Sequence, residues 1–233
     1  MDCSEQCVPD RGNRQATKGW TAHTPRDPTP SVSRGKLTPP DSITLRGPMA
    51  TAHPTSIPDV VLVQPEVHGD SRGFLLETFS ELDWREFGIE GPFVQENHSR
   101  SAARGTLRGM HFQTSPGQAK LVRCVRGAIF DVAVDLRRGS RTYGTWVGHV
   151  LDDETHHQLW VPAGFAHGFQ VLSEVADVAY KLTSLYDPKT ESEIAWDDPD
   201  IAIEWPIHEP VLSERDKVAP RLAEVADSLP FGR

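Results

Sequence analysis

The stretch Arg108-Gly109-Met110-His111-Phe112-Gln113 places an arginine and a histidine in the middle of a segment that predicts a β-strand. Ladders of hydrogen bonds hold a strand on both sides, so its side chains are aimed rigidly. Imidazole titrates near neutral pH, which makes a histidine fixed in this way a candidate base. The other notable polar residues lie downstream and are candidate partners: Lys120, His167, Tyr180 and Asp216.

Short segments of strand character surround this stretch, with turn residues between them. They are expected at 60–63, 74–79, 94–98, 106–113, 119–126, 128–136, 145–151, 158–161, 168–172 and 177–183. Many short strands at this spacing indicate an antiparallel sandwich or barrel rather than a parallel α/β sheet. A short helix is expected near 81–87 after an N-cap at Ser80, with Gly88 as its stop. A C-terminal helix is expected over about 214–226, capped by Ser213 and interrupted near Pro220.

The alternation of side chains along a strand predicts which of them share a face. In segment 177–183, Val178, Tyr180 and Leu182 share a face that we expect to point inward. Arg108 and His111 have opposite parity, so a regular strand cannot aim both at one cavity. A bulge at Gly109 would reconcile them, and we therefore expect a break in the ladder there.

Charge and composition restrict the class of protein. The chain has 233 residues and a net charge of −9; residues 1–48 carry +2, which leaves −11 for the remainder by difference. An acidic body argues against general nucleic-acid binding but allows one anionic small molecule held by local arginines. Three cysteines form no disulfide framework, and no apolar run reaches membrane-spanning length. These features predict a soluble cytoplasmic protein that binds neither nucleic acid nor membrane.

The first 48 residues differ in composition from the rest. They are rich in Pro, Thr, Ser, Arg and Gly, with apolar residues scattered singly. Such a segment cannot bury enough surface to offset its ordering entropy, so we predict a disordered extension at 1–48 and one domain at 49–233. Cys3 and Cys7 would make a weak metal pair, but no second pair accompanies them, and two incidental thiols are the better interpretation.

His111 has two interpretations on sequence alone. It is either a structural histidine or a base in a pocket for an anion. Arg104, Arg108 and Lys120 are expected near it, and several cations on an inward strand are costly unless an anion arrives. Lys120 could supply positive charge to a developing oxyanion. Asp216 could orient a histidine or complement a helix dipole.

A metal centre is the alternative use of the histidines. His149, His156, His157 and His167 accompany His111, and imidazole is a common metal ligand. However, the chain has no His-x-His pair that would place two rings on one face of a strand. His156 and His157 are adjacent to an acidic turn and are expected to be exposed. We therefore expect no metal and no cofactor.

A series of short motifs runs through most of the chain in a fixed order. They are Asp70 to Phe74, Gln95-Glu-Asn-His-Ser99, Leu107-Arg-Gly-Met-His-Phe-Gln113, Lys120-Leu-Val-Arg123, Gly127 to Asp135, Pro162-Ala-Gly-Phe-Ala-His-Gly-Phe169, Tyr180-Lys181, Trp196-Asp-Asp-Pro199 and Leu212-Ser-Glu-Arg-Asp216. With these motifs the chain resembles dTDP-4-dehydrorhamnose 3,5-epimerases from about Val60 to Leu222. Each motif is weak alone, but together and in order they are highly specific.

The resemblance implies a mainly β, cupin-like antiparallel jelly roll and a metal-free homodimer. Its implied activity is epimerisation of a dTDP-linked 4-keto-6-deoxy sugar at carbon 3, carbon 5 or both, for rhamnose or an antibiotic sugar. His111 is then the base, Asp216 its carboxylate, Tyr180 the acid on the opposite face and Lys120 the group that stabilises the enolate. Implied substrate contacts are Arg72, Glu77, Gln95, Asn97, Arg108, His167, Tyr186, Glu191 and Arg215, with Tyr186 stacked on the thymine.

The chain departs from the family pattern at several places. Met110 stands where leucine is usual, Arg215 replaces a frequent lysine, and the segment Ser101–Arg104 is one residue longer. Two other classes remain as alternatives. A non-catalytic sugar-nucleotide-binding jelly roll would not need His111, Asp216 and Tyr180 together. A metal-dependent cupin oxygenase would be expected to carry the His-x-His pair that this chain lacks.

Overall fold

The computed structural model describes residues 49–232. The predictions made for residues 1–48, including the Cys3–Cys7 pair, lie outside the described residues, so the domain boundary at 48 stays a prediction. Within residues 49–232, no helix is both long enough and apolar enough to cross a membrane.

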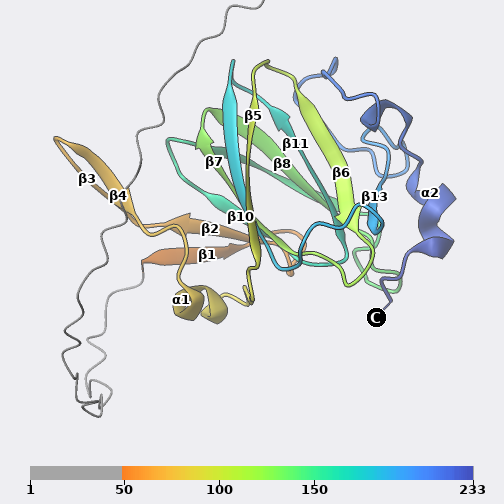
Figure 1. The fold of residues 1–233 in the computed structure, drawn as a ribbon, viewed down its shortest axis with the longest axis horizontal. Helices are drawn as coiled ribbons and strands as arrows, with labels where there is room; N and C mark the ends of the chain where they lie inside the picture. The colour runs from red at the N-terminus through yellow and green to blue at the C-terminus, as the bar shows by residue number, and fades with distance from the viewer. Residues whose placement is uncertain (1–48, 233) are drawn as a thin grey trace, which may run out of the picture. The chain divides into compact units, whose positions relative to one another are not determined.

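Two antiparallel sheets lie face to face (Figure 1). The six-stranded sheet has the order β1 (Ala50–Pro54), β2 (Val61–Pro65), β10 (Gln158–Val161), β7 (Lys120–Arg126), β12 (Ala176–Leu182) and β5 (Gln95–Ser101). The five-stranded sheet has the order β13 (Glu191–Glu193), β6 (Leu107–Gln113), β11 (Phe165–Val171), β8 (Ala128–Asp135) and β9 (Trp146–Asp152). The expected antiparallel β architecture is therefore confirmed.

Apolar side chains from both sheets fill the space between them. Val122 and Cys124 from β7 pack in one cluster with Ile129 and Ala133 from β8 and Phe169 from β11. Both faces of β8 are buried. One face lies in the core between the sheets, and the other packs against residues that follow the last strand. Ile129 and Ala133 point into the core between the sheets, whereas Val132 and Val134 point to the opposite side.

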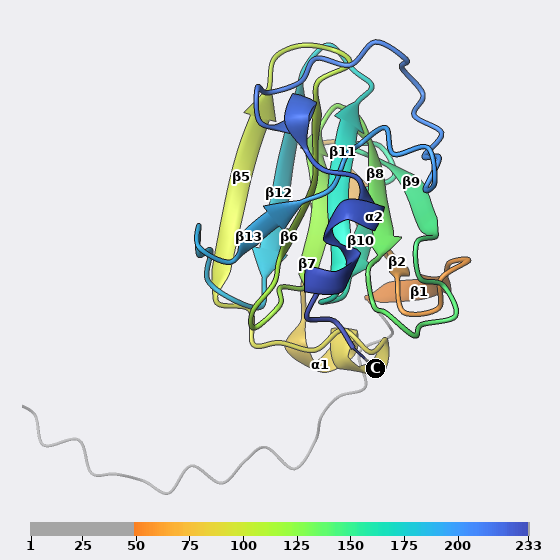
Figure 2. The same ribbon diagram turned by 90° about the vertical axis from the view of Figure 1, so that its right-hand side faces the viewer.

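The outer face of the five-stranded sheet is covered by residues 194–231, which we call the C-terminal segment. Its side chains Ile194, Trp205 and Leu222 pack on Phe112 of β6 and Val134 of β8. Figure 2 shows helix α2 (Leu222–Val225) of this segment in front of the sheet. The segment therefore owes its position to apolar packing.

Helix α1 (Glu81–Glu86) covers part of the outer face of the six-stranded sheet through the buried Trp84. Ser80 is its N-cap and accepts a hydrogen bond from the Asp83 amide at 3.4 Å. Gly88 ends the turn with φ +76°. The predicted cap and stop are both confirmed.

The predicted C-terminal helix is wrong as one element. The chain forms three short pieces instead: η1 (Asp216–Val218), α2 (Leu222–Val225) and η2 (Ala226–Ser228). Pro220 forces the preceding Ala219 out of the helical region, to φ −59° and ψ 138°. The interruption expected near Pro220 thus ends the first piece altogether.

The ladder between β6 and β11 is broken where the parity conflict requires it. His167 pairs with His111 and Phe169 pairs with Arg108, so two residues of β6 oppose the single Gly168. Gly109 has φ +139°, and a Cβ at this position would lie 2.5 Å from Gly168 Cα. Only glycine fits this close approach. The predicted bulge is confirmed, and both Arg108 and His111 line one cavity.

Three strands were not predicted. Strand β1 is an edge strand that ends in Pro54, and β13 has only three residues. The third is β3 (Val67–Asp70), which forms a separate hairpin with β4 (Gly73–Leu76). This hairpin projects away from the two sheets in Figure 1. The strand expected at 74–79 is correspondingly shorter.

Candidate active site

A cavity of about 510 Å³ lies between the two sheets. The six-stranded sheet contributes residues of β5, β7 and β12, and the five-stranded sheet contributes residues of β6, β11 and β13. The C-terminal segment closes one side. The lining residues are Gln95, Asn97, Ser99, Arg108, His111, Gln118, Lys120, His167, Phe169, Tyr180, Leu182, Tyr186, Glu191, Ser213, Arg215 and Asp216. All four predicted catalytic residues and seven of the nine predicted contacts are among them.

His111 and Asp216 form a hydrogen-bonded pair. His111 Nε2 lies 2.7 Å from Asp216 Oδ1, and the Ser213 hydroxyl donates to Oδ2 of the same carboxylate at 2.9 Å. Although burial opposes the charge, the hydrogen bond from His111 helps to lower the pKa of Asp216. An ionised carboxylate only accepts, so Nε2 carries the proton and Nδ1 keeps a lone pair. The imidazole is therefore arranged to accept a proton at Nδ1.

Lys120 reaches the cavity from the six-stranded sheet, opposite His111. Its side chain is buried, and Nζ donates to the backbone oxygen of His111 at 3.2 Å. Burial lowers the pKa of Lys120 to about 8, against the attraction of Asp131 and Glu191. Near neutral pH this is a positive charge in a poorly solvated place, where it can stabilise a developing anion strongly.

Tyr180 also comes from the six-stranded sheet, on the face predicted from parity. Its hydroxyl oxygen accepts a hydrogen bond from Asn97 Nδ2 at 3.3 Å, and Asn97 Oδ1 accepts from Gln95 Nε2 at 2.9 Å. The phenol therefore keeps its own proton available for donation. Tyr180 and His111 belong to opposite sheets, on either side of the cavity.

A network of charged residues forms the rim of the cavity. Arg215 Nη1 donates to Glu191 Oε2 at 2.5 Å, and Arg215 Nε donates to Glu193. The Tyr186 hydroxyl donates to Glu191 Oε2 at 3.0 Å, which raises the pKa of Tyr186. The Tyr186 side chain is half exposed, so its ring face is accessible to a planar group.

Some predicted residues lie elsewhere. Arg104 was expected near His111, but it is exposed and donates to the backbone of Leu172. Arg72 lies in the turn of the β3–β4 hairpin and pairs with Asp70, and Glu77 follows β4. Neither Arg72 nor Glu77 lines the cavity of its own chain.

The histidines that we expected to bind no metal do not gather at one site. His149, His156 and His157 do not line the cavity. His156 and His157 were expected to be exposed, but both are half-buried. The His156 ring packs against the Phe74 ring, with 4.5 Å between ring centroids. Among residues 49–232, the potential metal ligands that converge are His111, Glu193 and Asp216. The Arg215 guanidinium lies on Glu193, and this positive charge disfavours a cation at that place.

Sequence reasoning missed two acidic residues of this region. Glu193 Oε2 lies 3.8 Å from His111 Nε2, since β13 pairs with β6 in register. Asp131 is fully buried and hydrogen-bonded to His167. The visible signal for Asp131 was a carboxylate within an otherwise apolar strand. No sequence pattern predicted β13 or the position of Glu193.

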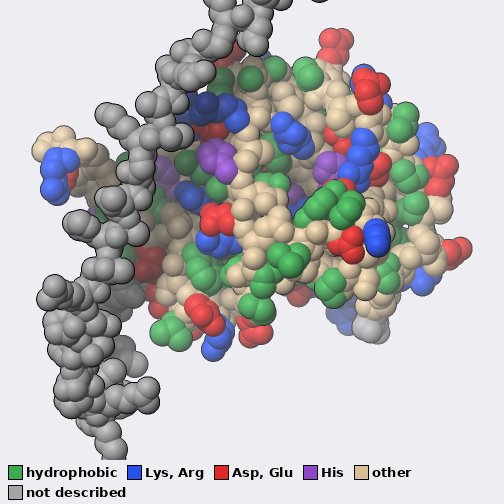
Figure 3. Space-filling view, in the orientation of Figure 1, with side chains coloured by type: hydrophobic (Ala, Val, Ile, Leu, Met, Phe, Trp, Pro, Cys, Tyr) green, Lys and Arg blue, Asp and Glu red, His purple; other side chains and the backbone are tan. Residues whose placement is uncertain are grey.

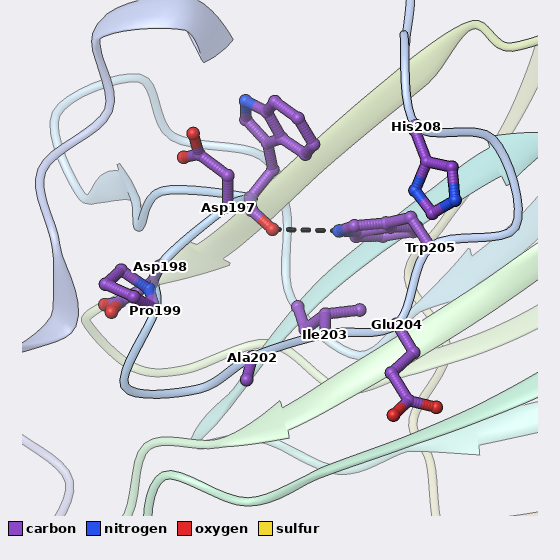
Figure 4. A pocket seen from close by; sticks show the side chains of 9 residues that line it. Asp197, Asp198, Pro199, Ala202, Ile203, Glu204, Trp205 and His208 are labelled. Atoms are coloured by element: carbon purple, nitrogen blue, oxygen red, sulfur yellow. Dashed lines mark hydrogen bonds between the residues drawn. The ribbon is translucent and has the colours of Figure 1, made fainter.

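A second cavity of about 520 Å³ lies in the loop from Trp196 to His208 (Figure 4). Its polar groups serve the loop itself. Asp198 accepts hydrogen bonds from the backbone amides of Asp200 and Leu222, and Trp205 Nε1 donates to the Trp196 carbonyl. The Asp197 and Glu204 side chains lie on opposite sides of the view in Figure 4. This cavity thus lacks the convergent acid–base groups of the first.

The distribution of charged side chains on the surface agrees with the acidic composition of the chain. On the described part of the face in Figure 3, acidic and basic side chains are interspersed rather than gathered into a basic stripe. A nucleic-acid-binding face needs such a stripe to neutralise phosphates.

Comparison with known proteins shows which family this chain resembles in sequence. The family model for dTDP-4-dehydrorhamnose 3,5-epimerase matches residues 54–224. The enzyme of that name from Pseudomonas aeruginosa is 51% identical over 177 residues, which are 75% of this chain and 97% of that protein. The one from Methanothermobacter thermautotrophicus is 51% identical over 166 residues, covering 70% of this chain and 89% of that protein.

Solved structures extend the likeness to the fold. A Legionella pneumophila dTDP-6-deoxy-D-glucose-3,5-epimerase in complex with dTDP-4-keto-L-rhamnose has a TM-score of 0.76 and 45% identity, covering 79% of this chain and 99% of that chain. A 4-keto-6-deoxy sugar epimerase from the novobiocin biosynthetic gene cluster of Streptomyces spheroides has a TM-score of 0.75 and 41% identity, covering 80% and 94%. The chain belongs to the dTDP-4-dehydrorhamnose 3,5-epimerase family and has its cupin-like jelly-roll fold.

Proposed function

We propose that this protein is an isomerase that epimerises a dTDP-linked 4-keto-6-deoxyhexose at carbon 3, carbon 5 or both, in deoxysugar nucleotide biosynthesis. Membership of the family supports this, as does the dTDP-sugar bound in the solved Legionella pneumophila structure. The single observation that carries it is the opposition of His111–Asp216 and Tyr180 across one cavity. An epimerase needs a base on one face of the sugar ring and an acid on the other.

The first step is removal of a proton next to the sugar ketone. The hydrogens at carbons 3 and 5 are acidified by the carbonyl at carbon 4, and a neutral imidazole within hydrogen-bond reach can accept one of them. His111 Nδ1 is the accepting atom, because Nε2 is already engaged with Asp216. Asp216 holds the ring in this tautomer and stabilises the imidazolium that forms.

The second requirement is stabilisation of the negative charge that develops on the carbonyl oxygen. Lys120 is the buried cation of the cavity, and its ammonium stabilises the enolate in a place that water screens poorly. Its pKa of about 8 keeps it charged near neutral pH.

Return of a proton completes the inversion. Tyr180 donates its phenolic proton to the face of the enolate opposite His111. If the proton returned from His111 the starting sugar would re-form. The hydrogen bond that Asn97 donates to the Tyr180 oxygen stabilises the phenolate left behind.

The rim of the cavity suits the nucleotide part of the substrate. The half-exposed Tyr186 stacks on the thymine, and Arg108 and Arg215 face the diphosphate. Glu191, Gln95, Asn97 and His167 supply the remaining polar contacts.

We also propose that the protein is a homodimer in which Arg72 and Glu77 serve the site of the partner. The β3–β4 hairpin carries Phe74 at 60% and Leu75 at 73% exposure, which is costly unless another surface covers them. The hairpin projects from its own sheets, so it is placed to reach a second copy (Figure 1). This gives Arg72 and Glu77 a route to a substrate that their own cavity does not offer.

Subunit mixing tests this exchange. Arg72→Ala and His111→Asn homodimers should each be nearly inactive, but refolding them together should restore activity. A mixed dimer holds one site with both defects and one intact site. Mixtures that stay as inactive as the two parents, or a protein that sediments as an active monomer, would refute the exchange.

Deuterium exchange tests the reaction itself. The wild-type protein, treated with a chelator and incubated in heavy water with dTDP-4-keto-6-deoxy-D-glucose, should place deuterium at carbon 3, carbon 5 or both. Proton NMR of the sugar gives the position and identifies the inverted centre. No incorporation at either carbon, in treated and untreated protein alike, would overturn the proposed function. Exchange that disappears only after chelation would overturn our proposal that this enzyme works without metal.

A further inference from the structure

A fully buried carboxylate stands behind the cavity without touching the proposed reacting atoms. Asp131 of β8 lies on the inner face of the five-stranded sheet, in register with Phe169 of β11 and His149 of β9. Its two oxygens lie 2.9 and 3.1 Å from Nε2 of His167. A buried charge is costly unless it is paired, so this pair calls for a reason beyond packing.

The pair fixes how His167 presents itself to the cavity. Burial lowers the pKa of His167, which keeps its ring neutral near neutral pH. An ionised carboxylate only accepts hydrogen bonds, so the single ring proton sits on Nε2. Among residues 49–232, His167 makes side-chain hydrogen bonds through Nε2 alone, and the ring lines the cavity. Nδ1 is therefore a lone-pair acceptor for a hydroxyl group of the sugar.

Asp131 also acts on Lys120. Burial lowers the pKa of Lys120, and the charge of Asp131 is the largest influence that raises it. Other charged and titratable groups face Lys120 from every surrounding element, namely Arg108 and His111 of β6, His167 of β11, Tyr180 of β12, Glu191 of β13, and Arg215 and Asp216 of the C-terminal segment. His149 of β9 stands beside Asp131, and its Nε2 is buried without a hydrogen-bond partner among the described residues.

We propose that Asp131 is a positioning residue for the epimerase reaction: it holds His167 as a hydrogen-bond acceptor for a sugar hydroxyl and balances the positive charge of Lys120. This rests on the proposed function, which it extends to a residue that does not touch the substrate. Asp131 thereby acts on His167 of the five-stranded sheet and on Lys120 of the six-stranded sheet.

Asp131→Asn is the informative substitution, because it keeps the shape and removes the charge. The amide can donate to Nε2, which favours the tautomer with the proton on Nδ1 and turns the acceptor into a donor. We expect kcat/KM to fall about 100-fold. Wild-type kcat/KM should decline above about pH 8, where Lys120 loses its proton. Without the Asp131 charge the pKa of Lys120 is lower still, so the decline should begin roughly one pH unit lower.

Asp135→Asn is the matched control. Asp135 lies on the same strand and is equally buried, but it bonds Arg137, Ser140 and Thr142 and does not line the cavity. The Asp135→Asn substitution should lower the free energy of unfolding and leave the alkaline decline of kcat/KM unchanged. An Asp131→Asn protein with the wild-type alkaline decline would overturn the proposed role at Lys120.

A measurement on the wild-type protein keeps the inference testable should the variant fail to fold. Long-range ¹⁵N–¹H NMR of histidine-labelled protein reports the tautomer of each ring, and a His167→Gln protein identifies the relevant signal. We expect protonated Nε2 and unprotonated Nδ1 at neutral pH. A protonated Nδ1 would overturn the proposal. This result needs no substrate, so it is independent of whether the wild-type protein passes the deuterium test.

Discussion

Replacing His111 with asparagine is expected to lower kcat/KM about 10⁴-fold and to remove deuterium incorporation at both carbons. Asparagine retains a donor toward Asp216, so the site should keep its shape, but an amide cannot accept a proton at the position of Nδ1. Without a base no enolate forms, and exchange and inversion vanish together. NMR of the sugar in heavy water measures both at once.

The matched control is His156→Asn. His156 is half-buried outside the cavity and should behave as wild type in both assays. Affinity of the His111→Asn protein for dTDP should change only severalfold, since the nucleotide contacts lie at the rim. Retention of substantial exchange by His111→Asn would mean that another group is the base, and the assignment would fail.

Tyr180→Phe is expected to separate two outcomes that the His111 change abolishes together. The substitution removes one hydroxyl and leaves His111, Asp216 and Lys120 in place. The base still takes a proton and returns deuterium from the same face, so exchange continues without change of configuration. Inversion should fall about 10³-fold, while exchange falls far less.

The ratio of exchange to inversion is therefore the quantity to measure. Tyr143→Phe is a suitable control, because Tyr143 packs against the outer core of the five-stranded sheet, away from the cavity. Equal loss of exchange and inversion in Tyr180→Phe would contradict the role of Tyr180 as the acid. It would indicate instead that the phenol helps to hold the enolate.

What the sequence could predict depended on local pattern. The parity of segment 177–183 placed Tyr180 inward, and the conflict between Arg108 and His111 required the bulge that Gly109 makes. Both arguments need only the period of a strand. The cap at Ser80 was equally local.

What the sequence could not predict depended on distant pairing. Glu193 approaches His111 only because a three-residue strand pairs with β6, and no periodicity marks so short a strand. Asp131 was visible as an acid within an apolar strand, but its role needs His167 from another strand. Arg104 was assumed to follow its neighbours inward, yet it lies before the strand begins, where parity has no meaning.

The C-terminal segment has two duties that are coupled by covalent connection. It covers the outer face of the five-stranded sheet through Trp205 and Leu222, and it delivers Asp216 to His111. The core between the sheets uses a different set of side chains. Detachment of the segment would therefore remove the carboxylate that orients the base while the inner core stays closed. We therefore expect the protein to lose activity before its two sheets unfold. The lifetime of the active enzyme is then set by how long the C-terminal segment stays packed on the five-stranded sheet.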